Sequence, residues 1–161
     1  LRATSVGVPA GTAGGRLNPA ALRTVVQAAI ADWSSTGLSA ELLSRMRQVQ
    51  FVVTDMPGSY LGMAADNTIY LDADAAGNGW FVDRTPSRSE EFRGAAGGDL
   101  RAVDRRAVDR MDLLTGVAHE LGHIAGLDDL DPQPGSLMSS TLSPGVRRTA
   151  WSAAVDKVFA S

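Results

Sequence analysis

Apolar residues recur at helical spacing in two stretches near the start of the chain. Asn18 followed by Pro19 is a typical helix start, and the periodicity after it predicts a helix over residues 19–35 that ends at Gly37. The apolar positions of this helix are Leu22, Val25, Val26, Ala29, Ile30 and Trp33. A second, shorter helix is predicted over residues 39–46. Two helices are therefore expected before the first long strand.

Two strands are predicted after these helices. Residues 49–55, VQFVVTD, are apolar and β-branched, and the Pro-Gly pair in the following MPGSYLG indicates a turn. In the next apolar stretch, NTIYLDAD, Ile69 and Leu71 face the side opposite to their neighbours in sequence. This alternation predicts a second strand with one buried face.

The middle of the chain is polar and carries an internal repeat. Residues 77–98 are rich in Gly, Pro and Ser around an apolar island, GWFVD, and we expect them to form an exposed, partly mobile insertion. Residues 101–110 contain RAVDR twice, which places Asp and Arg at interacting distances on a helix. The repeat therefore predicts a solvated helical face.

Two further helices are predicted in the second half of the chain. MDLLTGVAHELGHIAG keeps an apolar stripe and predicts a buried helix that ends at Gly126. The stripe consists of Leu113, Leu114, Val117, Ala118, Leu121 and Ile124. Near the C-terminus, the stretch from Arg148 predicts an amphipathic helix whose inward residues are Trp151, Val155, Val158 and Phe159.

Length and composition limit what the chain can be. With 161 residues, 44% of them hydrophobic, the chain suits a single domain over residues 1–161. Residues 1–16 are rich in Gly, Ala and Thr and are expected to form a linker or an irregular arm, with room for one short strand. Because the chain starts at Leu1 without a methionine, we expect it to be a piece of a larger protein.

Charge and residue types exclude several classes of function. The net charge is −3 and the basic residues are scattered among acidic ones, so a nucleic-acid partner is excluded. No apolar run approaches the length needed to cross a bilayer, so no membrane span is expected. The absence of cysteine excludes disulfides and thiolate metal ligands.

One short stretch, AHELGHIAGLDD at residues 118–129, holds both histidines of the chain. His119 and His123 are four residues apart, so on a helix their imidazoles can point at one metal ion. Glu120 is rotated by about 100° from His119 around the helix axis, which places its carboxylate beside a water on the metal. Zinc with three protein ligands lowers the pKa of such a water to ~7, and a neighbouring carboxylate can take the proton. The arrangement suits hydrolysis of an amide.

The third ligand is expected from the residues that follow the second histidine. Gly126 can adopt a positive φ, so the helix can stop and the chain can turn back toward the metal. Asp129, three residues later, is the expected third ligand, and Asp128 is its rival. A histidine on a helix is usually a core or surface residue, but this spacing together with the glycine favours a metal site.

These residues resemble the extended zinc-binding consensus of the metzincin metallopeptidases. HELGHIAGLDD matches HExxHxxGxxH or D, and the aspartate variant looks most like the snapalysin-type members. The downstream GSLMSS resembles the methionine-bearing turn of the group, which implies that Met138 is a hydrophobic floor beneath the metal. The resemblance is specific over residues 117–138.

A second likeness lies upstream. NTIYLDADAAGNGW is similar to the FDxDExW segment of matrixins, which implies that Asp72 and Asp74 are calcium ligands. Ala75 stands where that pattern has a glutamate, so the likeness is incomplete. Calcium is therefore expected only as a second ion beside zinc.

The resemblance implies a fold and an activity. The fold is α+β, a small metzincin-like domain with a twisted, mostly parallel sheet, an antiparallel edge strand, a long backing helix, the zinc helix and a C-terminal helix. The activity is zinc-dependent endopeptidase, with Glu120 as general base and then acid and a peptide substrate paired with an edge strand at residues 68–73. The same likeness implies an extracellular or cell-surface location, and we expect a monomer.

Three departures from the family pattern bear on these expectations. The third ligand is aspartate, the stretch between Asp74 and His119 is longer than in matrixins, and no tyrosine follows Met138 at the spacing that some metzincins use. The negative charge of an aspartate ligand should make a zinc-bound water less acidic, so we expect a slightly raised pH optimum. Leu142 and Pro144 indicate an apolar specificity pocket.

Two other interpretations use the same residues. The chain could be a non-catalytic module of a large secreted or surface protein, in which the metal only stabilises the fold. Glu120 argues against this, because a purely structural site has no use for a free carboxylate beside an open position. Alternatively, the chain could be a peptidase that processes its own parent protein, with residues 84–98 as the candidate cut site.

Overall fold

The computed structural model describes residues 1–7 and 17–150. Most of the predicted N-terminal arm, residues 8–16, lies outside the described residues. The predicted C-terminal helix also lies outside them from Trp151 onward. The remaining predictions can be compared with the structure element by element.

Three helices form where local signals predict them: α1 Pro19–Ser34, α2 Ala40–Arg47 and α3 Leu113–Ile124. Each starts with a side chain that accepts a hydrogen bond from a backbone N–H of the first turn. Asn18 caps α1 through Ala20 N at 2.8 Å, and Ser39 caps α2 through Leu42 N at 3.2 Å. Asp112 caps α3 through Thr115 N at 3.1 Å. The predicted helices over residues 19–35 and 39–46 and the buried helix that ends before Gly126 are confirmed.

The main sheet has three strands: β2 Gln50–Thr54, β3 Gly62–Ala65 and β4 Thr68–Asp72. Their order is β2-β4-β3, with β2 parallel and β3 antiparallel to β4. Ile69 and Leu71 are fully buried, as their alternation predicts. The expectation that residues 68–73 form the edge strand is wrong, because β4 lies in the centre and β3 forms the edge.

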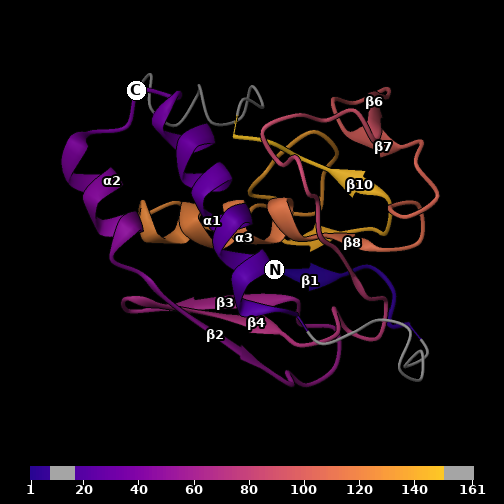
Figure 1. Ribbon diagram of the computed structural model, residues 1–161, viewed down its shortest axis with the longest axis horizontal. Helices are drawn as coiled ribbons and strands as arrows, with labels where there is room; N and C mark the ends of the chain where they lie inside the picture. The colour runs from indigo at the N-terminus through magenta and orange to yellow at the C-terminus, as the bar shows by residue number, and fades with distance from the viewer. Residues whose placement is uncertain (8–16, 151–161) are drawn as a thin grey trace.

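Helices α1 and α3 lie on the same side of this sheet, where Figure 1 shows α1 crossing α3. The two helices are joined by a buried hydrogen bond in which Trp33 Nε1 donates to the carbonyl of Ala118 at 2.9 Å. Trp33 and Leu71 belong to one buried apolar cluster that includes much of α3. Helix α3 is therefore closely packed against both α1 and the sheet.

The other strands are short and link distant segments. They are β1 Arg2–Ala3, β5 Trp80–Phe81, β6 Phe92–Gly94, β7 Leu100–Ala102, β8 Met111–Asp112, β9 Thr141–Leu142 and β10 Val146–Arg147. β1 pairs in parallel with β9, β5 pairs in parallel with β8, and β10, β7 and β6 form an antiparallel sheet. The short strand allowed within residues 1–16 is confirmed as β1.

Residues 77–98 are not the exposed insertion that their polarity predicts. Trp80, Phe81 and Phe92 are buried, and the rings of Phe81 and Phe92 pack edge to face with centroids 5.8 Å apart. The pairing of β5 with β8 and of β6 with β7 ties this segment to the rest of the fold. Its apolar island supplies side chains to two buried clusters, which outweighs its polar composition.

The RAVDR repeat is not helical either. Its first residues belong to β7, and turns follow up to β8. Asp104 accepts a hydrogen bond from Arg106 N at 2.7 Å and forms an ion pair with the same residue at 2.8 Å. This local pairing of an aspartate with the residue two positions later competes with helix formation.

The described chain is thus an α+β structure of three helices and several small sheets. Over residues 1–7 and 17–150, no helix is long and apolar enough to cross a membrane.

Candidate metal centre

The structure brings three of the predicted ligands together at the C-terminal end of α3. The Nε2 atoms of His119 and His123 lie 3.2 Å apart. Asp129 Oδ1 lies 3.0 Å from His119 Nε2 and 3.6 Å from His123 Nε2. Among the described residues, this is the group of histidine and acidic side chains whose ligand atoms are close enough to share one ion. Its rival Asp128 is not part of the group.

A tight chain reversal explains why Asp129 reaches the histidines. Helix α3 ends at Ile124, and Gly126 follows with a φ of 92°, a backbone conformation that residues with side chains rarely adopt. Leu127 N then donates to the carbonyl of Gly122 at 3.0 Å, which fixes the direction of the returning chain. The same reversal places the carbonyl of Leu127 2.8 Å from His123 Nδ1. One turn therefore supplies the third ligand and orients the second.

Both imidazoles are oriented by backbone carbonyls. His119 Nδ1 lies 2.8 Å from the carbonyl of Leu137, and His123 Nδ1 lies at the same distance from that of Leu127. A carbonyl only accepts hydrogen bonds, so each Nδ1 is the donor and carries the hydrogen. In a neutral ring this leaves a lone pair on Nε2. The lone pairs of His119 and His123 therefore face each other and the Asp129 carboxylate.

This arrangement fits a divalent cation. Three lone-pair-bearing atoms repel one another at such distances unless a proton or a cation lies between them. Zinc with bonds of about 2.0–2.1 Å and tetrahedral angles requires ligand atoms about 3.3 Å apart, close to the distances observed here. The neighbouring His119 ring lowers the pKa of Asp129 to about 2, so this group is a carboxylate at neutral pH. Two imidazoles and a carboxylate are a typical zinc donor set.

The Met138 segment lies beneath α3. Met138 is buried, and a Cβ atom built on Gly122 would lie 3.0 Å from Met138 Cε and 3.2 Å from Trp33 Cζ2. The neighbouring Leu137 supplies the carbonyl that orients His119. Leu130 N donates to the carbonyl of Met138 at 2.8 Å, which ties the segment to the loop that carries Asp129. Met138 therefore packs against the ligand helix, and its turn supports two of the three ligands.

Glu120 lies next to the three ligands and is fully buried. Its Oε1 is 3.0 Å from the nitrogen of Leu1, while Oε2 has no hydrogen-bond partner among the described residues. Gly62, the first residue of edge strand β3, lies over this carboxylate. A Cβ atom at Gly62 would lie 3.0 Å from Glu120 Cγ and Oε1. The edge strand thus leaves room for Glu120 only because this position is glycine.

The two calcium candidates cap a loop in the structure. Asp72 accepts hydrogen bonds from Met56 N at 2.6 Å and from Ala76 N at 2.7 Å, and Asp74 accepts one from Gly77 N at 2.8 Å. Burial raises the pKa of Asp72 by more than these amides lower it. Neither carboxylate belongs to a group of three potential ligands among the described residues. Calcium binding stays a prediction.

A buried arginine at the N-terminal end of α3 was missed by the sequence analysis. Arg147 is fully buried and forms ion pairs of 2.8 Å with Asp112, which caps α3, and with Asp83. Its guanidinium also lies 4.2 Å from the centre of the Phe92 ring. Burial alone would lower the pKa of Arg147, but the two carboxylates raise it above its ordinary value. No local pattern signals this contact, because its members are far apart in sequence.

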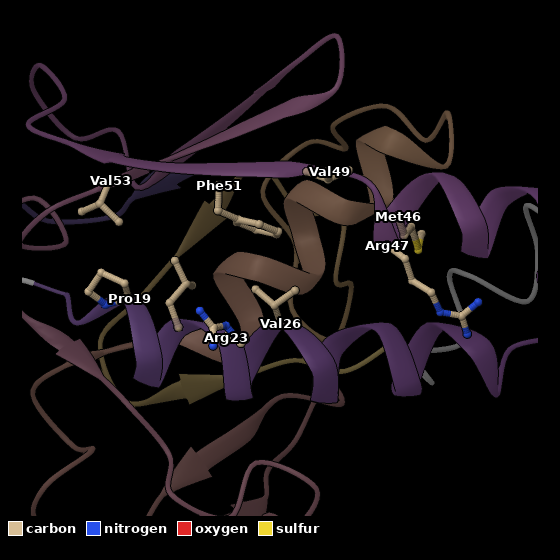
Figure 2. Close-up of a pocket in the computed structure, with 9 residues that line it drawn as sticks. Pro19, Arg23, Val26, Met46, Arg47, Val49, Phe51 and Val53 are labelled. Atoms are coloured by element: carbon tan, nitrogen blue, oxygen red, sulfur yellow. The ribbon is translucent and has the colours of Figure 1, made fainter.

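A separate hollow lies between α1, α2 and β2 (Figure 2). It has a volume of about 460 Å³ and is lined by the apolar side chains of Leu22, Val26, Phe51 and Val53, with Arg23 and Arg47 nearby. None of the three ligands and neither oxygen of Glu120 reaches it. The hollow is therefore separate from the cluster of His119, His123 and Asp129.

The cluster can hold one divalent cation and keeps a buried carboxylate beside it. No protein-family model, curated protein or solved structure matches this chain. What the chain does therefore has to follow from the chemistry of His119, His123, Asp129 and Glu120.

Proposed function

We propose that the chain is a zinc-dependent endopeptidase of the metzincin type. His119, His123 and Asp129 would hold the ion, and Glu120 would act as general base and then as general acid. The observation that carries the proposal is the placement of a fully buried carboxylate beside three convergent ligand atoms. Burial of an ionisable group without a full set of partners is costly and concentrates at functional sites.

The ligand set supports zinc in a catalytic role. Zinc held by three protein ligands keeps a fourth position for water, lowers the pKa of that water to about 7 and polarises a carbonyl oxygen. The protein contributes the fixed orientation of the rings through the carbonyls of Leu137 and Leu127. Asp129, ionised at neutral pH, contributes the one negative charge of the ligand set.

The surroundings of Glu120 support a role in proton transfer. Its Oε1 lies 3.0 Å from the nitrogen of Leu1. Its Oε2 is buried without a hydrogen-bond partner in the described part of the chain, so it is available to accept a proton. A positioned carboxylate that takes a proton from water and passes it to a leaving amine contributes roughly 10²–10⁴-fold to the rate.

The edge strand of the main sheet is the expected docking strand for a substrate peptide. β3 has one edge paired with β4, and its first residue lies over Glu120. An extended peptide that adds to the end of this strand would bring a backbone carbonyl close to the ligands. An extracellular or cell-surface location, a monomeric state and calcium as a second ion complete the proposal, and these points depend on the family resemblance.

The two competing interpretations make different use of the site. A non-catalytic metal module has no use for a carboxylate beside an open metal position. Self-processing shares the chemistry, but most of the cut site proposed for it is structured. Only residues 93–98 of the segment 84–98 form a continuously exposed stretch. The exposed stretch is the place to look for a self-cleavage product.

The proposal is tested by exchanging Glu120 for glutamine, which keeps the shape and removes the charge. Native chain and E120Q should each bind about one zinc per chain by elemental analysis, whereas E120Q should lose casein cleavage by about 10²–10⁴-fold. E41Q, on the exposed face of α2, is the matched control and should cut like the native chain. Full cleavage by E120Q, or folded native chain without zinc, would refute the proposal.

A further inference from the structure

The first four residues lie between two segments of the chain, one of which reaches Glu120 at Gly62. On one side the segment pairs with residues 59–62, and on the other side it pairs with residues 140–142. The bonds to the first side are Leu61 N to Leu1 O at 3.0 Å and Ala3 N to Ser59 O at 2.7 Å. Those to the second side are Arg2 N to Ser140 O and Thr4 N to Leu142 O, both at 2.9 Å. Successive residues therefore form backbone hydrogen bonds alternately to residues 59–62 and to residues 140–142.

The segment has the geometry of a docked peptide strand. Arg2 is bridged in antiparallel fashion to Tyr60, and β1 runs parallel to β9 on the other side. The side chains of Leu1 and Ala3 are buried, whereas Arg2 is exposed. A peptide held this way gains affinity from backbone bonds and specificity from every second side chain.

The register of this strand relates it to the proposed chemistry. The nitrogen of Leu1 lies 3.0 Å from Glu120 Oε1 and 3.2 Å from the carbonyl oxygen of Gly62. In a peptidase of the proposed type, Glu120 delivers a proton to the amine nitrogen that leaves. The nitrogen of Leu1 therefore lies where the nitrogen of a scissile bond would be, and residues 1–4 extend from it to one side.

We propose that residues 1–4 occupy the product side of the substrate groove and compete with peptide substrates for it. The placement of the segment depends on its backbone bonds, whereas its inhibitory consequence rests on the proposed peptidase function. A tethered segment acts at an effective concentration of the order of millimolar. Free peptides must displace the segment before they can bind. Their apparent affinity is therefore the intrinsic affinity multiplied by the fraction of chains in which the groove is empty.

A point remote from Glu120 anchors the segment. Gly7 N donates to the carbonyl of Ala76 at 2.9 Å, and Asn78 Nδ2 donates to the carbonyl of Ser5 at 2.9 Å. A Cβ atom at Gly7 would lie 2.5 Å from Gly77 C and 2.8 Å from Asn78 N, which is too close for any side chain. G7A should therefore release the segment. The neighbouring Val6 is 63% exposed, so V6A is the matched control.

The probe is the peptide Leu-Arg-Ala-Thr with a dye at its carboxyl end, and the readout is fluorescence anisotropy with metal-free protein. G7A and A3P should bind it at least about tenfold more tightly than the native chain and V6A. A3P is the second route, because proline removes the N–H that bonds to Ser59 and leaves the distal anchor intact. Binding by G7A and A3P no tighter than by the native chain would overturn the proposal.

Hydrogen exchange in the native chain gives a test that needs no variant. The amides of Arg2, Ala3 and Thr4 should exchange more slowly than those of Ser5 and Val6. Equal rates in the two groups would also overturn the proposal. These readouts use no zinc and no turnover. They can therefore show that residues 1–4 fill the groove even if the peptidase proposal fails, and they can show that the groove is empty even if the protein is a peptidase.

Discussion

Met138 packs directly against Gly122, which lies on α3 between the two histidines of the candidate site. A Cβ atom at Gly122 would lie 3.0 Å from Met138 Cε and 3.2 Å from Trp33 Cζ2. Glycine within a helix costs about 1 kcal/mol relative to alanine, so its presence here needs a packing reason. The close approach of Met138 supplies that reason and links the turn after the ligand loop to the helix.

G122A should therefore destabilise the fold by about 1–3 kcal/mol, because the methyl group over-packs a rigid contact and outweighs the gain in helix propensity. G116A is the matched control on the same helix. Its Cβ would meet only the outer ring atoms of Trp80, at 3.2 Å, so its free energy of unfolding should stay within about 1 kcal/mol of that of the native chain. Urea denaturation measures both, and equal values would contradict the packing argument.

Sequence signals located the helices and the cluster of candidate ligands because these features are local. Asn18 caps its helix as predicted, and the second helix begins next to Ser39, where its start was predicted. The three ligands lie within eleven residues and are placed by one helix and one turn at Gly126. For such a local group, the spacing of the residues along the chain nearly determines their positions in space, because little of the rest of the fold is needed to bring them together.

The edge strand of the main sheet and the buried ion pairs could not be predicted from the sequence in the same way. β3 consists of Gly, Met and Ala, without the β-branched residues that mark strands, and it exists because it pairs with β4. Arg147 meets Asp112 across 35 residues of sequence, and no periodicity connects them. For residues 101–110 the sequence predicted a helix that does not form. Strand pairing of β6 with β7 and the local turn at Asp104 outweigh the helical spacing of the charges.

Gly62 should act as a positioning residue for Glu120. In G62A the added methyl group would lie 3.0 Å from Glu120 Cγ and Oε1, and the backbone oxygen of Tyr70 at 3.2 Å blocks escape on the other side. We expect kcat to fall by roughly 10–100-fold with zinc content unchanged, because a small displacement of a catalytic group is costly. M63A, at an exposed position of the same strand, should retain kcat.

A structural role alone would not change the pH dependence of the residual activity. If G62A displaces the general base, its kcat profile should differ in shape from that of M63A, because proton transfer has become limiting. An unchanged kcat for G62A, or equal losses of kcat in both variants, would contradict this assignment.

Arg147 should be a main stabilising contact at the N-terminal end of α3. R147M leaves the carboxylates of Asp112 and Asp83 buried without their cation, and breaking such a pair costs roughly 3–5 kcal/mol. R106M removes an arginine whose side chain is 60% exposed, so water already screens its ion pair and the loss of stability should be much smaller. The free energies of unfolding of the two variants, measured in urea, should differ by this margin, and similar values would show that the buried network contributes little.

The zinc affinity of the site should depend on pH through the histidines and not through Asp129. The neighbouring His119 ring lowers the pKa of Asp129 to about 2, so the stabilisation that its charge gives the fold is present above the ordinary carboxyl value of 3.8 and is lost as the pH falls through about 2. Protons therefore compete with zinc at His119 and His123 alone, since metal ligands must be deprotonated.

Competition with a chromogenic chelator between about pH 5 and 8 should then show uptake approaching two protons per ion released at the acidic end. D129N should weaken zinc binding at every pH and keep the same limiting proton number. D128N, at an exposed position outside the cluster, should bind zinc like the native chain. A third proton in the native chain that disappears in D129N would mean that Asp129 titrates with the histidines. Equal loss of affinity in D128N and D129N would mean that the chain reversal at Gly126 presents the wrong carboxylate.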